Sequence, residues 1–539
     1  MSDVIQIHDS YCTHSDSTEV QLSCDGVSET KSTLTSLDVY SIRFIHCRNV
    51  YPLYLIRPLN QYPPRDFLKE IITELHACNL TINSFLGDNP KRSIARHCLS
   101  HSSSFPCEYC FNQGALFRDS NNSLSNELSQ LQSQINSLQS QDVHDNNTQE
   151  NLSLLQSLEH SMTKKTKKKT KTVWPANTRH GEPRTKPSIL AILADMEANP
   201  TLSKKEKKGI VSKSPFLDLP YFDFVLDMPV DYMHTACLGV VKKLIELCFT
   251  VGEVRPRVTN RKLSSTAVFN DRMATIKVPR EFSRRGRSLN FSVMKAQEFR
   301  NIILFFFPFI IACFSPRDKE IKLWLLLSYT LRACILPSDE TMPINFDVIG
   351  HCADKFYILY EQLFGSTNCT YNTHVLCSHI LEMRRNNNSL TNSSCFGFEN
   401  FYSSMRRSYV PGTSSPLKQI LSKTFLHHIV STHHCLTPIF YSPKDTHLQC
   451  NSLVYQFVNE EYHFFHINSI EDDNISCSPL GKQQHTFPGC SLNWSKIGVF
   501  KTGAISNDTI IISKSSIHGK VLRVSNLLIT CPNNVLREK

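Results

Sequence analysis

The stretch Leu80-Thr-Ile-Asn-Ser-Phe-Leu-Gly-Asp-Asn-Pro90 decides the fold of the first hundred residues. Leu80 to Leu86 has strand character, and Pro90 suits the first turn of a helix. Asp88 therefore stands where a strand ends and a helix begins. The simplest role for an acid at this point is a helix cap.

The residues before this stretch predict three more strands and a helix. Short runs rich in β-branched and aromatic residues predict the strands, and apolar residues at helical spacing predict the helix. The order strand, strand, strand, helix, strand indicates an α/β domain. The three strands and the helix are expected at Gln21 to Cys24, Val39 to Ile45, Val50 to Leu55 and Asp66 to Cys78.

Two further acids stand in unusual surroundings. Asp25 ends the first strand in Leu22-Ser-Cys-Asp-Gly26, although an Asp-Gly pair is more often only a turn. Glu399 is one acid on an otherwise apolar helical face in Cys395-Phe-Gly-Phe-Glu-Asn-Phe-Tyr402. Singly, each acid is more often structural. Together with Asp88 they could hold two Mg²⁺ ions, which prefer hard oxygen ligands and can activate one oxygen while stabilising another.

A second set of residues has the composition of a zinc site. Cys107-Glu-Tyr-Cys110 presents two thiols in one turn, and His374-Val-Leu-Cys-Ser-His379 presents two imidazoles on or near a helix. Four such ligands can surround one Zn²⁺ and leave no open position, so the site would be structural. A redox pair and a coincidence among 20 cysteines are the alternatives.

A third element is Pro229-Val-Asp-Tyr-Met-His234, which leads into a helix expected at Thr235 to Phe249. Asp231 could cap that helix by accepting its free amide hydrogens. His234 could orient other groups or contact DNA near the metal ions. We expect a supporting role for both residues rather than a catalytic one.

Bulk composition excludes several classes of protein. The chain has 539 residues and a net charge of +10, which suits a polyanionic partner without requiring one. The first residues have no secretory signal, so most of the cysteines should be free thiols rather than a disulfide scaffold. The apolar stretches Ile302 to Cys313 and Leu323 to Leu327 are shorter than the roughly 20 residues of a membrane span.

Composition also divides the chain. A leucine stripe from Leu124 to Leu138 predicts a helical hairpin, or less favourably a dimerising coiled coil, and Leu152 to Leu158 predicts its second helix. The basic cluster at Lys164 to Lys171 suits a nuclear address, a phosphate contact or a solvated linker. The expected units are the first part of the core (1–115), the leucine-rich and lysine-rich insert (116–214), a helical insertion (215–365), the closing part of the core (366–431) and a β-rich terminal domain (432–539).

As an ordered set, these motifs resemble the animal transposases of the CACTA (En/Spm-like) group. The resemblance covers roughly residues 21–413 and extends in outline to the catalytic subunit of the V(D)J recombinase. It is carried by Cys24-Asp-Gly-Val-Ser-Glu-Thr-Lys31, Gly87-Asp-Asn-Pro-Lys-Arg92, Cys107-x-x-Cys110, Leu219-Pro-Tyr-Phe-Asp223, Asp231-Tyr-Met-His234 with Leu238-Gly239, and Phe398-Glu-Asn-Phe401.

The resemblance implies a ribonuclease-H-like core, interrupted by a helical insertion before the last acid. Asp25, Asp88 and Glu399 would form a DDE triad that binds two Mg²⁺ or Mn²⁺ ions and cleaves and joins DNA strands. Zn²⁺ would be structural. Double-stranded DNA would be the partner, the active complex a homo-oligomer, and the location the nucleus, with no membrane involved. The nearest candidates for phosphate contacts are Lys91, Arg92, Arg406 and Arg407.

The chain also departs from this family. Only 24 residues precede Asp25, whereas such transposases carry a longer N-terminal region that recognises the ends of the element. The alternative is therefore a host-adopted or truncated transposase-derived protein that binds DNA or acts as a scaffold without catalysis. The DNA sequence bound and the role of the terminal β-rich domain do not follow from the sequence.

Overall fold

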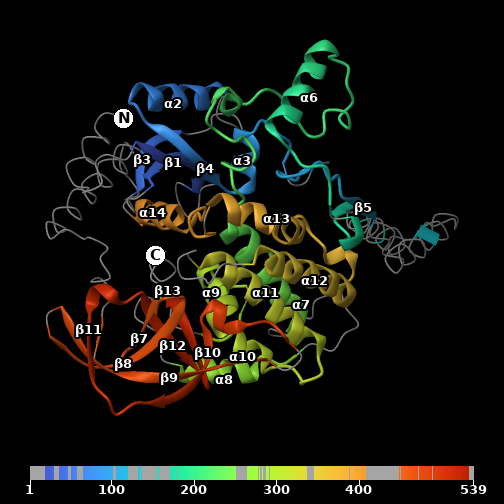
Figure 1. Ribbon diagram of the computed structural model, residues 1–539. Helices are drawn as coiled ribbons and strands as arrows, with labels where there is room; N and C mark the ends of the chain where they lie inside the picture. The colour runs from blue at the N-terminus through green and yellow to red at the C-terminus, as the bar shows by residue number, and fades with distance from the viewer. Residues whose placement is uncertain are drawn as a thin grey trace, which may run out of the picture.

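The computed structural model describes a small β-sheet, a layer of helices and a second, larger β-sheet (Figure 1). The expectation of a mixed α/β protein is confirmed. The residues that the structure describes are 18–28, 36–45, 50–56, 65–100, 103, 105–118, 132–133, 135, 155, 157, 170–178, 180–249, 264–276, 278, 282, 287–290, 292–336, 345–387, 389–407, 448–449, 451–471, 473–487 and 490–532.

The first sheet has four strands in the order β3-β2-β1-β4. The first three strands are antiparallel neighbours, and β4 returns through α2 to lie parallel to β1 on its other side. All the strands and the helix expected here from the sequence are present. Their bounds are β1 (Glu19–Ser28), β2 (Ser36–Phe44), β3 (Val50–Ile56), α2 (Arg65–Ala77), β4 (Thr81–Gly87) and the following α3 (Asn89–Ala95).

The two faces of β1 differ in chemistry, and different helices cover them. Val20, Leu22 and Cys24 are buried on one face. Cys24 pairs there with Tyr40 of β2, whose ring contacts Phe67 of α2 at 5.8 Å. Residues 21, 23 and 25 alternate onto the polar face. Because the helix α14 (Phe396–Arg407) packs on this polar face, Figure 1 has α2 and α14 on opposite sides of the sheet.

The middle of the chain is helical, and one of its long helices, α11, is almost entirely buried. In α11 fourteen of the 17 residues are buried, which is typical of a helix at the centre of a core. No helix among the described residues has the length and apolar character to cross a membrane. The helices are α6 (Lys186–Ala198), η3 (Met233–Val241), α7 (Lys242–Cys248), α8 (Ala267–Thr275), α9 (Ala296–Asn301), η4 (Ile302–Phe306), α10 (Phe307–Ile311), α11 (Lys319–Ile335), α12 (Phe346–Phe364) and α13 (Tyr371–Asn387), with short 3-10 turns η1 (Ala176–Thr178), η2 (Pro215–Asp218), η5 (Ser366–Asn368), η7 (Trp494–Ile497) and η8 (Lys514–Ser516).

Two of the expected helices contain wide turns that the sequence pattern did not predict. In the expected helical insertion, the apolar stretch that begins at Ile302 is divided into the π-helix η4 and α10, directly after α9. Pro308 accounts for the break, because it has no amide hydrogen for the regular helical bond. The other, η3, is a π-helix whose Gly239 packs on α13. A Cβ at Gly239 would lie 2.5 Å from Nδ2 of Asn372.

The last part of the chain forms the larger sheet. Six strands close into a ring in the order β10-β13-β12-β7-β8-β9, because β9 pairs with β10, and β11 adds to the outer edge of β9. Apolar side chains, among them Tyr455, Phe464 and Phe500, form its core. The strands are β7 (Leu453–Val458), β8 (Glu461–Glu471), β9 (Asn474–Gln484), β10 (Val499–Ile505), β11 (Ile510–Ser513), β12 (Gly519–Val524) and β13 (Leu527–Pro532).

A separate two-stranded ladder pairs β5 (Ala115–Arg118) with β6 (Thr170–Val173). The leucine stripe, the second leucine helix and most of the lysine cluster fall between these strands. Apart from a few isolated positions, these segments lie outside the described residues.

A buried arginine joins the helices to the ring of strands. Arg332 of α11 donates hydrogen bonds to the carbonyl oxygens of Leu304 (2.7 Å), Ile497 (2.8 Å) and Thr530 (3.2 Å). Its burial lowers the pKa of the guanidinium to about 10. Beside it, Phe307 stacks on Trp494 with ring centroids 5.2 Å apart.

We expect Arg332→Met to destabilise the protein by about 3 kcal/mol, because buried carbonyls would lose charged donors. The midpoint of urea unfolding, followed by tryptophan fluorescence, measures the change. Arg317→Met, at an exposed arginine before α11, is the matched control and should leave the midpoint unchanged. Equal midpoints for the two variants would show that the Arg332 contacts contribute no net stability.

Candidate metal centres

The parallel pairing of β1 and β4 brings two of the expected acids together. Cys24 lies opposite Gly87 in this pairing, so Asp25 and Asp88 occupy the next position on each chain. The backbones approach closely here, because a Cβ on Gly87 would lie 3.0 Å from the carbonyl oxygen of Cys24. A glycine at this position therefore allows the two strand ends to lie side by side.

Asp88 also has the helix-cap role considered from the sequence. It is the N-cap of α3, and its Oδ1 accepts a hydrogen bond from the amide of Lys91 at 2.9 Å. This bond fixes the carboxylate at the end of the sheet. Capping and metal binding are compatible, since a carboxylate has several acceptor positions.

Glu399 reaches the same place from a distant part of the sequence. It lies in the first turn of α14, which packs on the polar face of β1, and Tyr402 of the same helix hydrogen-bonds to Ser23 at 3.3 Å. The charge of Glu399 raises the pKa of Asp25, so the two carboxyls face the same space. The charges of Glu399 and Asp88 therefore both act on Asp25, although the oxygens of the three acids do not all lie within 4.8 Å of one another, as those of a closed ligand group would.

The pKa values of Asp25 and Glu399 are raised by burial and by neighbouring negative charges. Burial, followed by the charges of Glu399 and Asp88, raises the pKa of Asp25 to about 7. Burial also raises the pKa of Glu399, although the nearby His234 opposes the increase. One proton is therefore readily retained between Asp25 and Glu399 near neutral pH, and a cation that binds there must replace it.

Asp231 and His234 connect the helix η3 to α14. Asp231 is buried and accepts hydrogen bonds from the amides of Met233 (3.1 Å), His234 (3.0 Å) and Cys395 (2.9 Å). Its Oδ2 also lies 2.7 Å from Nδ1 of His234, while Nε2 of His234 lies 4.0 Å from Glu399. The supporting role expected for both residues fits this arrangement.

The charge state of His234 follows from these contacts. Burial alone would lower its pKa, but the hydrogen bond and charge of Asp231, together with the charges of Glu399 and Asp88, raise the pKa to about 9. The imidazole is therefore a cation at neutral pH. It places one positive charge beside the acids.

Two of the residues expected to contact phosphate have partners within the protein. Nζ of Lys91 lies 2.5 Å from Oδ1 of Asp38. Arg92 is 1% exposed and forms a buried ion pair with Glu108 at 2.9 Å. The guanidinium of Arg92 makes this ion pair inside the protein, where it is too deeply buried to contact DNA. This corrects the expectation from the sequence.

The other two expected phosphate contacts are Arg406 and Arg407. They form the last turn of α14. The environment of their side chains lies outside what the structure describes. Their contact with DNA stays a prediction.

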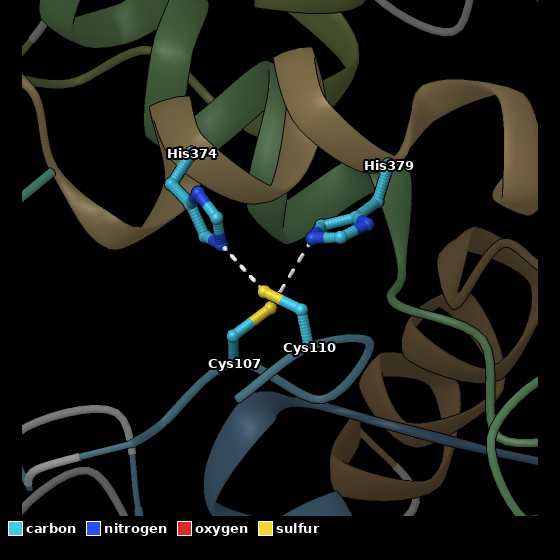
Figure 2. A group of neighbouring side chains, drawn as sticks. All are labelled: Cys107, Cys110, His374 and His379. Carbon is cyan, nitrogen blue, oxygen red and sulfur yellow. Dashed lines mark hydrogen bonds between the residues drawn. The ribbon is translucent and has the colours of Figure 1, made fainter. Parts of the chain in front are cut away.

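The Cys and His residues of the second expected site converge completely (Figure 2). Cys107 and Cys110 come from the loop after α3, and His374 and His379 from α13. Sγ of Cys107 lies 3.5 Å from Nε2 of His379, and Sγ of Cys110 lies 3.6 Å from Nε2 of His374. All four side chains are buried, and their ligand atoms lie within 4.8 Å of one another.

These distances fit a tetrahedral zinc ion. With Zn–S near 2.3 Å and Zn–N near 2.05 Å, tetrahedral geometry separates sulfur and nitrogen by about 3.6 Å. A hydrogen bond with Cys107 and backbone amides of Asn112 and Gly181 lower the pKa of Cys110, which favours the thiolate. The rings are also held in place, because His374 stacks on Trp174 and His379 on Tyr109.

Glu108, between the two cysteines, has a role that the sequence did not reveal. It is buried, pairs with Arg92 and lies 3.6 Å from Arg96, and the two arginines hold the pKa of its carboxyl below the usual range despite its burial. Asn89 of α3 donates another hydrogen bond to it at 3.0 Å. This network attaches the cysteine loop to α3, directly after Asp88. The short pattern Cys-Glu-Tyr-Cys contains no signal for it.

Comparisons with known proteins do not identify the chain. No protein-family model matches the sequence, and no curated protein matches it.

We expect the purified protein to contain about one zinc ion per chain. Cys107→Ser and His374→Ala should lose it and lower the melting temperature, because metal binding would be coupled to folding of the loop. Mass spectrometry with inductively coupled plasma measures the metal content. Cys313→Ser, at a half-buried cysteine in the helical layer, should retain zinc. A wild-type protein without zinc would argue against this assignment.

A pH dependence follows from His234. Its folded pKa of about 9 lies above the unfolded value of about 6.5, so its stabilising contribution is complete below about pH 6.5 and is lost as the pH rises through 9. Without added divalent metal, His234→Gln should lower the melting temperature more at about pH 6 than at about pH 10. His351→Gln, at an exposed histidine of α12, is the control. A difference that does not change with pH would contradict the charged state of His234.

Proposed function

We propose that this chain is the catalytic part of a cut-and-paste DNA transposase, with two divalent metal ions held by Asp25, Asp88 and Glu399. One observation carries the proposal. The charges of Glu399 and Asp88 both raise the pKa of Asp25, although 311 residues separate Asp88 from Glu399 in the sequence (399 − 88). Like charges gathered from such distant segments are costly to a fold, and they are typical of sites that bind cations.

The arrangement of the first sheet supports a ribonuclease-H-like core. Three antiparallel strands precede a helix and a parallel fourth strand, and the first two acids stand at adjacent strand ends. The helix that carries Glu399 returns to the same sheet after the helical layer. The proposal treats this layer as an insertion into the core.

The donor set suits Mg²⁺ or Mn²⁺, because three carboxylates supply hard oxygen ligands. When bound, two such ions would activate a water or a 3′-hydroxyl and stabilise the oxygen that leaves the phosphodiester. Asp25 and Asp88 would hold the metals from rigid strand ends. Glu399 would complete the site from α14. Asp25 would give up its proton on metal binding.

His234 and Asp231 act on the acids rather than on DNA in this proposal. The imidazolium of His234 offsets part of the negative charge beside Glu399, at 4.0 Å. Asp231 holds that imidazole and, through the amide of Cys395, the start of α14. Together they keep Glu399 directed at Asp25.

The remaining parts of the proposal rest on the resemblance and on charge. The net charge of +10 suits double-stranded DNA as substrate, with both the transposon ends and the target as sites of reaction. Zn²⁺ at Cys107, Cys110, His374 and His379 would be structural. We also propose that the protein acts in the nucleus and that its active complex is a homo-oligomer.

Nicking of supercoiled plasmid by the purified chain, in Mg²⁺ and in Mn²⁺, tests the proposal. We expect metal-dependent nicking that falls by about 10³-fold or more in Asp88→Asn and in Glu399→Gln, because each removes a metal ligand. Glu471→Gln, at an exposed acid of the terminal sheet, is the matched control and should nick like the wild type.

The alternative is a transposase-derived protein that binds DNA without cleaving it. DNA binding with no nicking in either metal would favour that alternative. Nicking that persists unchanged in both variants would rule out these acids as the catalytic group.

A further inference from the structure

A cavity lies between the helical layer and the terminal ring of strands, away from both metal centres. Its volume is about 550 Å³, within the usual range for small-molecule sites. The helix α8 and Phe309 of α10 form one side, and β12 with the residues before β7 forms the other. In Figure 1, α8 and α10 are at the opposite end of the molecule from β1 and β4.

The charges around this cavity have one sign. Arg272, Lys520 and Arg523 line it, and no acidic side chain does so among the described residues. Neither Arg272 nor Arg523 has a carboxylate partner in the described part of the chain. Three cations around one concave space attract anions, because low-dielectric walls concentrate their field.

The strand pattern explains why a lysine faces this space. Along β12, Lys520 alternates onto the same face as Leu522 and Val524, and both of these pack in the core shared with the helices. Lys520 is only 6% exposed. Its ammonium is therefore held at the junction of sheet and helices.

The other lining groups suit a ligand with hydroxyl groups. Gln449, Asn451, Ser452 and Thr275 offer hydrogen-bonding side chains. The ring of Phe309 forms an apolar wall, and the guanidinium of Arg272 lies 5.7 Å from its centroid. Because Arg272 lies over this buried ring, the ring holds the guanidinium at the wall of the cavity.

We propose that this cavity binds a phosphorylated ligand of nucleotide size, with Arg272, Lys520 and Arg523 around the phosphates. Guanidinium groups match phosphate oxygens in geometry as well as in charge. The ligand is either a free nucleotide or a nucleotide unit of a DNA strand. Only the second source rests on the proposed function, because none of the lining residues belongs to the acid group.

Binding of ATP and of a short oligothymidylate, measured by isothermal titration calorimetry without divalent metal, tests this inference. We expect the wild type to bind at least one of them. Arg272→Gln and Arg523→Gln should each weaken that binding about tenfold, the loss of one charge-assisted hydrogen bond. Arg317→Gln removes the same charge from an exposed site outside the cavity and should bind like the wild type.

The two ligands separate the two sources. If the cavity variants bind ATP more weakly than the wild type does, the natural ligand is a free nucleotide. If they weaken only the binding of oligothymidylate, the ligand is a DNA strand. The inference is overturned if the wild type binds neither ligand, or if both cavity variants bind as Arg317→Gln does. The calorimetric test measures binding without divalent metal and the nicking assay measures cleavage with it, so the two results can fail separately.

Discussion

Repulsion among three carboxyls at the end of β1 is the constraint that the surrounding structure has to satisfy. Asp25 and Asp88 are adjacent because β4 pairs with β1 in parallel, and Glu399 is added from the opposing helix. Burial and these neighbours raise the pKa of Asp25 to about 7, which is a cost to folding whenever the group is ionised. The charged His234, held by the buried Asp231, reduces this cost. A site strained in this way is stable only if something else fixes its parts.

Two buried networks provide that fixation. The amide of Cys395 donates to Asp231, so the start of α14 is tied to η3. On the other side, the Cys and His cluster joins the loop after α3 to α13, and Glu108 within that loop pairs with Arg92 of α3. Both networks connect segments that are far apart in sequence. The acids therefore depend on contacts that none of them makes directly.

Local sequence patterns predicted the strands of the first sheet and the positions of its acids. The run of apolar residues into Gly87 and Asp88 predicted the strand end, and the matching pattern at Asp25 predicted its neighbour. Contacts between segments that are distant in the sequence were harder to predict. Nothing in the sequence distinguishes Arg92, which is buried against Glu108, from an arginine that faces DNA, because the partner is 16 residues away in a separate loop. The wide turns at η3 and η4 were also missed, since apolar spacing does not report a local change of helical pitch.

The terminal ring of strands is connected to the helices by a different kind of contact. Arg332 bonds to main-chain carbonyls of both parts instead of to a carboxylate, so the junction depends on backbone positions and not on a second charge. Phe307 and Trp494 pack beside it and exclude water. This rigid junction and the cationic cavity lie along the same boundary, where Lys520 and Leu522 share one face of β12. A ligand in the cavity would therefore contact both parts at once, and its binding energy would add to the contacts that already hold them together.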